Sequence, residues 1–232
     1  MTLSIPSYIQ AAGVVHQPIE HEWKDADEQA VLTGNATLEP KIRTISHKGI
    51  AAISLGAIEW LIWRLEQHLP DRVPFQIVEA SWAGIIDWRY LKWQDLPIEE
   101  WEELPWPVGE PLINAFRLFK EMLFMLRDGG FIPVISSCLA ELPLHVLNDP
   151  EPYKQWRRFV VRRLAKKHPA NREDRMGTAV PRQALDPNCD YESANSAELV
   201  SVFLQGLDHS QNPYLSSPEE IIEQGFSGTP YA

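Results

Sequence analysis

Residues 46–69 read SHKGIAAISLGAIEWLIWRLEQHL, and Pro70 follows them. The apolar residues of this stretch recur at three- and four-residue spacing, which predicts a helix. They are Ile50, Ile53, Ala57, Ile58, Leu61, Ile62, Leu65 and Leu69. A helix that is apolar around most of its circumference must be covered by neighbouring elements on several sides. We therefore expect this stretch to be the central helix of a mainly helical, all-α domain.

The polar residues of the same stretch predict a narrow strip in contact with solvent. They are Glu59, Trp63, Arg64, Glu66 and Gln67. The charged ones also leave no clean run of about 18–20 apolar residues, the length that a membrane-spanning helix needs. The N-terminus has no basic stretch followed by an apolar one, so no signal peptide is expected. Together these features predict a cytoplasmic protein with no membrane association.

Helical patterns continue after the central stretch. We predict a helix from Pro74 to about Trp93, antiparallel to the central one because the connection is short. Further helices are expected over 112–127 and from 151 to 167. Residues 131–147 are predicted to form a buried helix, with a short strand at 131–136 as the alternative.

The chain divides into three parts that we expect to form one domain. Residues 1–43 are predicted to be a long irregular segment that wraps over the core, with a short helix at 25–32. Residues 44–168 form the helical core, with a short strand pair as an option. Residues 169–232 are a long loop and two short C-terminal helices, which begin at capping boxes at 195–198 and 217–220.

The composition and net charge of the chain indicate which kinds of macromolecule it could bind. The 232 residues are 44% hydrophobic and 23% charged, as in an ordinary globular protein, and the formal net charge is −11. Such a charge repels phosphates, so nucleic acid is an unlikely whole-surface partner and a basic protein is favoured. Nine tryptophans also allow a homodimer in which some of them are buried between subunits.

Linear signatures of catalysis are missing. The sequence contains no GxSxG, HExxH, Walker A or GxGxxG motif. The cysteines, Cys138 and Cys189, have no zinc-binding spacing and are too few for a disulfide framework. We therefore assign no catalytic residue, no metal ligand and no cofactor, and the sequence favours a protein that is not an enzyme.

The candidate site is an acidic segment that carries tryptophan. It comprises Glu99, Glu100, Trp101, Glu102, Glu103 and Trp106. Carboxylates can steer and select a basic surface, while a tryptophan can supply a desolvated anchor. The alternative is that both tryptophans pack into the core and the glutamates are merely solvated.

A second charged stretch has two interpretations. Ten of the 21 Lys and Arg residues lie between Lys154 and Arg182, and none follows Arg182. Basic side chains along the 154–167 helix could follow a phosphate backbone. The alternative, which we favour, is that the acidic segments of the same chain neutralise them.

These observations lead to one hypothesis and two alternatives. The hypothesis is a non-catalytic acidic protein that sequesters a basic protein partner, in concrete form an immunity protein that neutralises a cognate toxin. The first alternative is an enzyme whose site is assembled from scattered residues. The second is a helical regulatory scaffold that contacts nucleic acid through 154–167.

Overall fold

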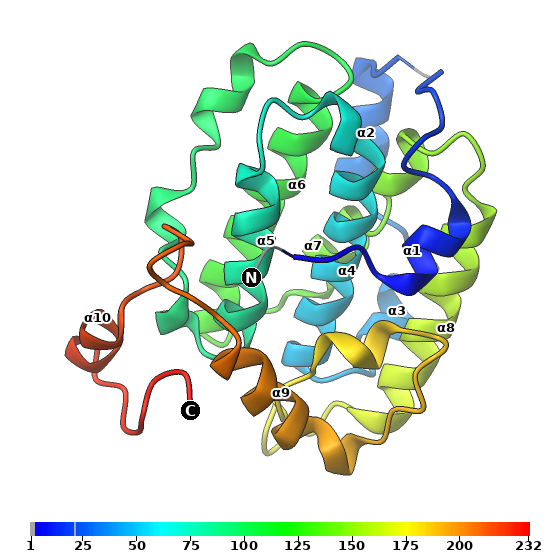
Figure 1. Cartoon of the computed structure of the whole chain (residues 1–232). Helices are drawn as coiled ribbons and strands as arrows, with labels where there is room; N and C mark the ends of the chain where they lie inside the picture. Colours follow the sequence, from blue (N-terminus) through cyan, green and yellow to red (C-terminus); the bar gives the residue numbers. More distant parts are fainter. Residues whose placement is uncertain (1–2, 21) are drawn as a thin grey trace.

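The computed structural model describes residues 3–20 and 22–232. The central helix of the sequence prediction is α4 (His47–Leu65), with a final 3₁₀ turn η1 (Glu66–His68). Around it pack four helices, which Figure 1 shows on several sides of α4: α5 (Val73–Ile86), α6 (Gly109–Arg127), α7 (Pro133–Leu139) and α8 (Glu151–Lys167). The predicted all-α class is confirmed.

Within the described residues there is no β-sheet. In place of the strand pair that the sequence left open, two isolated bridges join Ile45 to Pro169 and Leu91 to Leu215. Each one ties a loop to a distant part of the chain through backbone hydrogen bonds, for example from the Ser46 amide to the His168 carbonyl at 2.9 Å.

The ends of α4 and α5 show how the helices pair. The Ser46 hydroxyl caps α4 by accepting a hydrogen bond from the Gly49 amide. The Lys48 ammonium at the start of α4 donates to the Ile86 carbonyl at the end of α5 (2.8 Å). The two helices are therefore antiparallel, as predicted.

The prediction that α5 continues to about Trp93 is wrong. The helix ends at Ile86 because Asp87 adopts an extended backbone, with φ −148° and ψ 126°. The Asp87 carboxylate accepts from the Arg89 amide and so caps a separate 3₁₀ turn, η2 (Trp88–Tyr90). Aspartate competes with helix continuation in this way because its short side chain bonds nearby backbone amides.

The prediction of a solvated strip on the central helix is wrong for the first three of its five residues. Glu59 and Arg64 are 0% exposed and Trp63 is 5% exposed. A buried charge is tolerated only when it is paired or fully hydrogen-bonded. Distant parts of the chain supply those partners.

Glu59 is paired with Arg182, which begins the 3₁₀ turn η6 (Arg182–Leu185). The Arg182 Nε atom donates to both Glu59 carboxylate oxygens, at 2.8 and 3.1 Å, and Trp82 Nε1 donates to Oε1 at 2.6 Å. The glutamate thus joins α4 to α5 and to the loop that follows α8.

Arg64 is satisfied entirely by backbone carbonyls. Its guanidinium donates to Val146 O at 3.0 Å and to Val14 O at 3.1 Å. It also donates to the carbonyls of Gln17 and Pro18. This arginine fastens the N-terminal segment and the end of the 131–147 region to the central helix.

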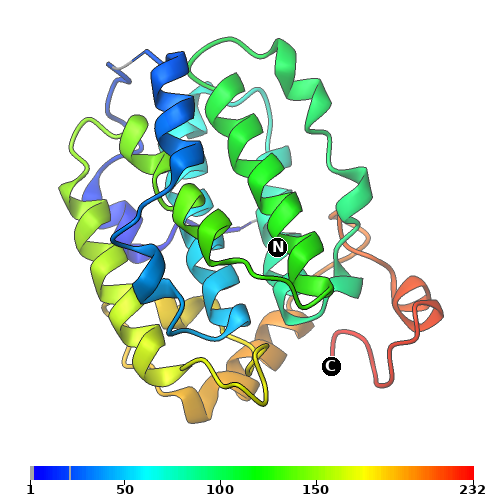
Figure 2. The same cartoon turned by 180° about the vertical axis from the view of Figure 1, so that it is seen from behind.

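The N-terminal segment contains more helix than the sequence indicated. It forms α1 (Ser7–Ala12), α2 (Asp25–Thr33) and α3 (Glu39–Ile42). The predicted helix at 25–32 is confirmed by α2, and Gly34 follows its last residue with φ 68°. Figure 2 shows α2 and α3 lying against α7 and α8 on the far side from the C-terminal tail.

The remaining elements refine other predictions. The 131–147 region is helical but in two pieces, α7 and the 3₁₀ turn η5 (Leu142–His145). Near the C-terminus are α9 (Ser196–Gln205) and α10 (Pro218–Glu223). The capping box at 217–220 is confirmed by reciprocal hydrogen bonds, whereas Asn195 makes no side-chain cap.

Close packing of α8 on α4 depends on Gly56. A Cβ atom at this position would lie 2.8 Å from the Trp156 ring and 2.7 Å from a Leu185 methyl group. Only glycine permits this approach, which allows Trp156 to reach Leu185 O with its Nε1 atom at 3.0 Å.

Among the described residues, no helix combines the length and apolarity required to cross a bilayer.

Candidate functional site

The predicted acidic segment folds as a 3₁₀ turn, η4 (Glu99–Glu103). All four of its glutamates are exposed, while the tryptophan between them is buried. Their shared surface is called the acidic surface below. In Figure 2 the 88–108 region, which carries it, runs along the upper right of the molecule, away from α3 and α8.

Trp101 is 6% exposed, and its ring centroid lies 5.1 Å from that of Phe116 on α6. It therefore holds η4 on α6 and does not present its ring to a partner. Trp106 is partly buried against the core. Of the two interpretations, the packing of Trp101 matches the one that places it in the core.

Two further carboxylates, from outside η4, act on the same region as Glu100. Burial raises the pKa of the Tyr214 hydroxyl, and the charges of Glu100, Asp71 and Asp95 raise it further. Asp71 lies in the α4–α5 connection and Asp95 in η3 (Trp93–Asp95). We include both in the acidic surface.

One arginine lies within the acidic surface. Arg117 of α6 forms an ion pair with Glu102, and both side chains are 55% exposed. Such an exposed pair contributes little to stability. Among the described residues, Glu99, Glu100 and Glu103 have no cationic partner within ion-pair distance.

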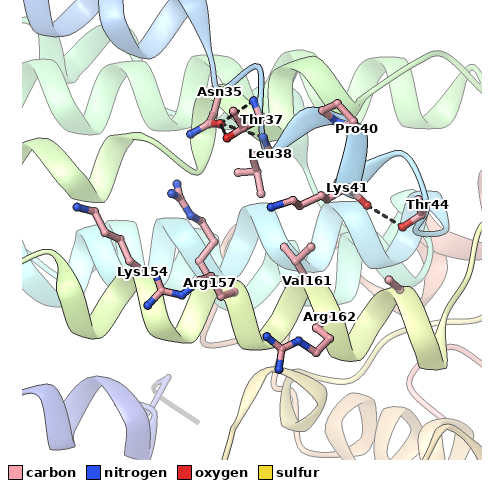
Figure 3. Close-up of a pocket in the computed structure, with 12 residues that line it drawn as sticks. Asn35, Thr37, Leu38, Pro40, Lys41, Thr44, Lys154, Arg157, Val161 and Arg162 are labelled. Atoms are coloured by element: carbon pink, nitrogen blue, oxygen red, sulfur yellow. Dashed lines mark hydrogen bonds between the residues drawn. The ribbon is translucent and has the colours of Figure 1, made fainter.

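A cavity lies elsewhere, between the α2–α3 region and α8. It is a groove of about 680 Å³, and we call it the basic groove (Figure 3). Five of its lining residues are cationic and none is acidic: Lys41, Lys154, Arg157, Arg158 and Arg162. Its existence was not apparent from the sequence, because its two walls lie more than 100 residues apart.

The interpretation that acidic segments neutralise the basic helix holds for part of α8. Arg157 pairs with Glu141 at 2.7 Å, Arg158 with Glu151 at 2.6 Å, and Lys167 with Glu192. Arg163 donates to the Ala184 carbonyl in η6 and to the carbonyls of Asp186 and Cys189 in the loop that follows.

Three of the cations that line the basic groove have no acidic partner in the described part of the chain. Of the described carboxylates, none lies within ion-pair distance of Lys41, Lys154 or Arg162. In Figure 3, Lys41 from α3 and Arg157 from α8 extend toward each other across the groove, and Lys154 lies further along it. Arg162 points to the other side of α8.

A third polar cluster lies beside a smaller cavity. Glu79 of α5 and Arg182 line a cavity of about 190 Å³ beside Trp82. Burial raises the pKa of Glu79, although a hydrogen bond from the Asn212 amide (3.1 Å) partly offsets this. The guanidinium of Arg182 donates hydrogen bonds to Glu59 and to the Ser4 carbonyl (2.7 Å), so this cluster joins five parts of the chain.

Within the described part of the chain, no three His, Cys, Asp or Glu side chains converge as metal ligands would. Cys138 is buried, and its thiol contacts the Leu32 carbonyl. Comparison of the chain with protein-family models, with curated proteins and with solved structures found no match in any of the three.

Proposed function

We propose that this chain is a non-catalytic binding protein whose acidic surface covers a basic region of a protein partner. The observation that carries the proposal is the display of four exposed carboxylates on one short turn, η4, anchored by the buried Trp101. Asp71 and Asp95 extend the same negative field from two other segments.

The mechanism is occlusion guided by charge. Carboxylates held on a packed element lose little freedom when they meet a cationic surface, so less of the binding free energy is spent on ordering them. Complementary charge also raises the rate of association and disfavours acidic competitors. Trp106, which is partly buried beside the turn, can contribute apolar contact at the edge of the interface.

In its most specific form, the proposal is an immunity protein that neutralises a toxin with a basic substrate-binding surface. The net charge of −11 and the absence of the common catalytic motifs favour this role. Partner candidates are basic proteins encoded beside this chain, and the acidic surface would cover the groove through which such a toxin holds its substrate.

The test is a binding measurement with such a candidate and two charge-matched variants. The first variant changes Glu99, Glu100, Glu102 and Glu103 to Gln. The control changes four other exposed glutamates to Gln, which are Glu28, Glu173, Glu198 and Glu223. Both variants lose four negative charges, so any difference between them reflects the location of the charges and not the net charge.

We expect the first variant to lose at least about tenfold in affinity and the control to change less than about threefold, because surface charge acts over roughly a Debye length. Equal losses in the two variants would contradict a defined binding surface. Full retention of affinity by the first variant would place the contact elsewhere on the chain.

A second candidate, the enzyme with a site assembled from scattered residues, is favoured by one observation. Glu79, with its raised pKa, and Arg182 line the same cavity, and perturbed carboxyl groups in cavities are typical of catalytic acids. Turnover of a small molecule by the purified chain, abolished by Glu79→Gln and retained in the four-glutamine variant of η4, would support it over the binding role.

A further inference from the structure

We propose that the basic groove binds an organic phosphate of about the size of a nucleotide. This inference concerns a surface separate from the acidic one and does not depend on the proposed function. It rests on the charge, the shape and the apolar floor of the groove between α3 and α8 (Figure 3).

The charge of the groove is opposite to that of the whole chain. Five cationic side chains line it in a protein whose formal net charge is −11. Two of them are paired with Glu141 and Glu151, and Arg162 points away from the groove. The remaining two, Lys41 and Lys154, have no carboxylate partner among the described residues. Unpaired cations that converge on a concavity repel one another, and an anionic ligand would relieve that repulsion.

The helix α8 brings its cations to one side by spacing. Positions 154, 157, 158, 161, 162 and 165 all line the groove. Members of this set recur at three- and four-residue spacing, for example 154, 158, 161 and 165, so they form one stripe along the helix. Lys41 of α3 approaches this stripe from the opposite wall. A ligand between the two walls would therefore meet positive charge on both sides.

One cation of the stripe is already oriented. Arg157 Nη1 donates to the Ala140 carbonyl and to Glu141, both at 2.7 Å. The described hydrogen bonds leave its Nε and Nη2 atoms without an acceptor. A guanidinium that is fixed on one edge presents its other edge at little entropic cost, and arginine binds phosphate oxygens in a two-pronged geometry.

The floor and the size of the groove indicate an organic body on the anion. Leu38 and Val161 are buried residues of the lining, and Pro40 and Ala165 add further apolar surface. The volume of about 680 Å³ lies within the range of 300–1,000 Å³ that is typical of small-molecule sites. Inorganic phosphate alone would leave most of this space and the apolar floor unused.

The groove does not continue as a long nucleic-acid track along α8. Beyond Ala165, Lys167 is paired with Glu192. Arg163, which precedes Ala165, is turned away toward the carbonyls of residues 184, 186 and 189. An extended strand would also meet the negative field of the rest of the chain. A compact phosphate ligand gains the local charge and avoids that repulsion.

The experiment is calorimetric titration of the full chain at constant ionic strength with four probes. They are adenosine diphosphate, inorganic pyrophosphate, adenosine and a single-stranded oligonucleotide. We expect the diphosphate to bind most tightly, pyrophosphate at least about tenfold more weakly because it lacks the apolar body, and adenosine not measurably.

The variants separate the groove from general surface charge. Lys41→Ala with Lys154→Ala removes two groove cations that make no described ion pair. Lys120→Ala with Lys166→Ala removes two lysines that do not line the groove. We expect the first pair to weaken binding of the diphosphate at least tenfold and the second less than threefold, with unchanged helical circular dichroism in both.

Three results would overturn the inference. The first is no heat of binding for the diphosphate at millimolar concentration. The second is equal weakening by the two lysine pairs, which would indicate nonspecific attraction. The third is tighter binding of the oligonucleotide than of the diphosphate, which would assign the groove to nucleic acid. None of these results bears on the acidic surface, so the two proposals fail or succeed separately.

Discussion

Two regions of this molecule use the same residue types in opposite ways. In α4, Glu59 and Arg64 are fully buried, and each is held by groups from distant segments. In η4, four glutamates are exposed and only Glu102 has an ion-pair partner among the described residues. The comparison shows that a charged residue is structural where tertiary neighbours complete its hydrogen bonds, and that it is available for binding where they do not.

The largest loss of stability that we expect follows from substitution of Glu59. Changing Glu59 to Ala leaves Arg182 and Trp82 Nε1 without their acceptor in the interior. Removal of one member of a buried pair costs about 3–5 kcal/mol of stability. Urea denaturation would measure the loss, with Glu99→Ala on η4 as the matched exposed control, for which we expect a change within about 0.5 kcal/mol.

A double variant sharpens this result. If the cost arises from the uncompensated charge, then Glu59→Leu combined with Arg182→Met should recover a large part of the stability, because it removes both charges. A double variant no more stable than Glu59→Leu alone would contradict this explanation and point to loss of packing around α4.

The next largest loss of stability is expected from substitution of Arg64. Its replacement by Met keeps the apolar stem and removes hydrogen bonds to four carbonyls of the N-terminal and 131–147 segments. We expect a loss of about 2–3 kcal/mol, similar to one or two hydrogen bonds to a charged group. The control is Arg158→Met on the surface of α8, where the exposed pair with Glu151 is worth less than about 1 kcal/mol.

Protection of amide protons would locate the damage. Hydrogen exchange should accelerate in 14–18 and near Val146 in the Arg64→Met variant before it does so in α5 and α6, since those segments supply the carbonyl partners. Uniform acceleration across the chain would instead mean that Arg64 supports the whole core.

A smaller change in stability is expected when the pH is lowered, because a buried histidine resists protonation in the folded chain. Burial lowers the pKa of His168, which lies at the end of α8 beside Tyr191 and Thr178. The unfolded chain protonates this imidazole below about pH 6.5, whereas the folded chain keeps it neutral to lower pH. The unfolded state then binds more protons, so stability falls as pH drops from about 6.5 toward the folded pKa.

The measurement is the urea midpoint between pH 7.5 and 5.5. His168→Gln should flatten its pH dependence in this window, and His68→Gln, at an exposed position, should leave it as in the parent chain. His47, whose pKa burial also lowers, accounts for a residual slope. An unchanged slope in His168→Gln would show that this imidazole ionises in the folded chain as it does in the unfolded one.

The smallest effect on stability is expected at the acidic surface itself. The variant with Gln at 99, 100, 102 and 103 removes four exposed charges and one exposed ion pair, so its unfolding free energy should change by no more than about 0.5 kcal/mol. A loss above about 2 kcal/mol would show that these carboxylates support the fold, and their role in binding would then need other evidence. This stability measurement therefore serves as the control for the binding experiment, because it shows whether the four-glutamine variant is still folded when its affinity for the partner is measured.

Sequence periodicity alone determined the all-α class, the central position of 46–69, the 151–167 helix and the capping box at 217–220. These features depend on residues a few positions apart, whose spacing sets a helix face or a cap. The acidic segment at 99–103 was also visible, because its four glutamates are neighbours in the chain.

Only the tertiary structure decided which charged side chains are exposed to solvent. The burial of Glu59 depends on Arg182, more than 120 residues away, and the burial of Arg64 depends on carbonyls of four loop residues. The basic groove likewise needs Lys41 and α8 to meet. Periodicity indicates which residues share a helix face. The segments that folding brings against that face determine whether its charged residues are exposed to solvent, are buried with hydrogen-bond partners or line a groove.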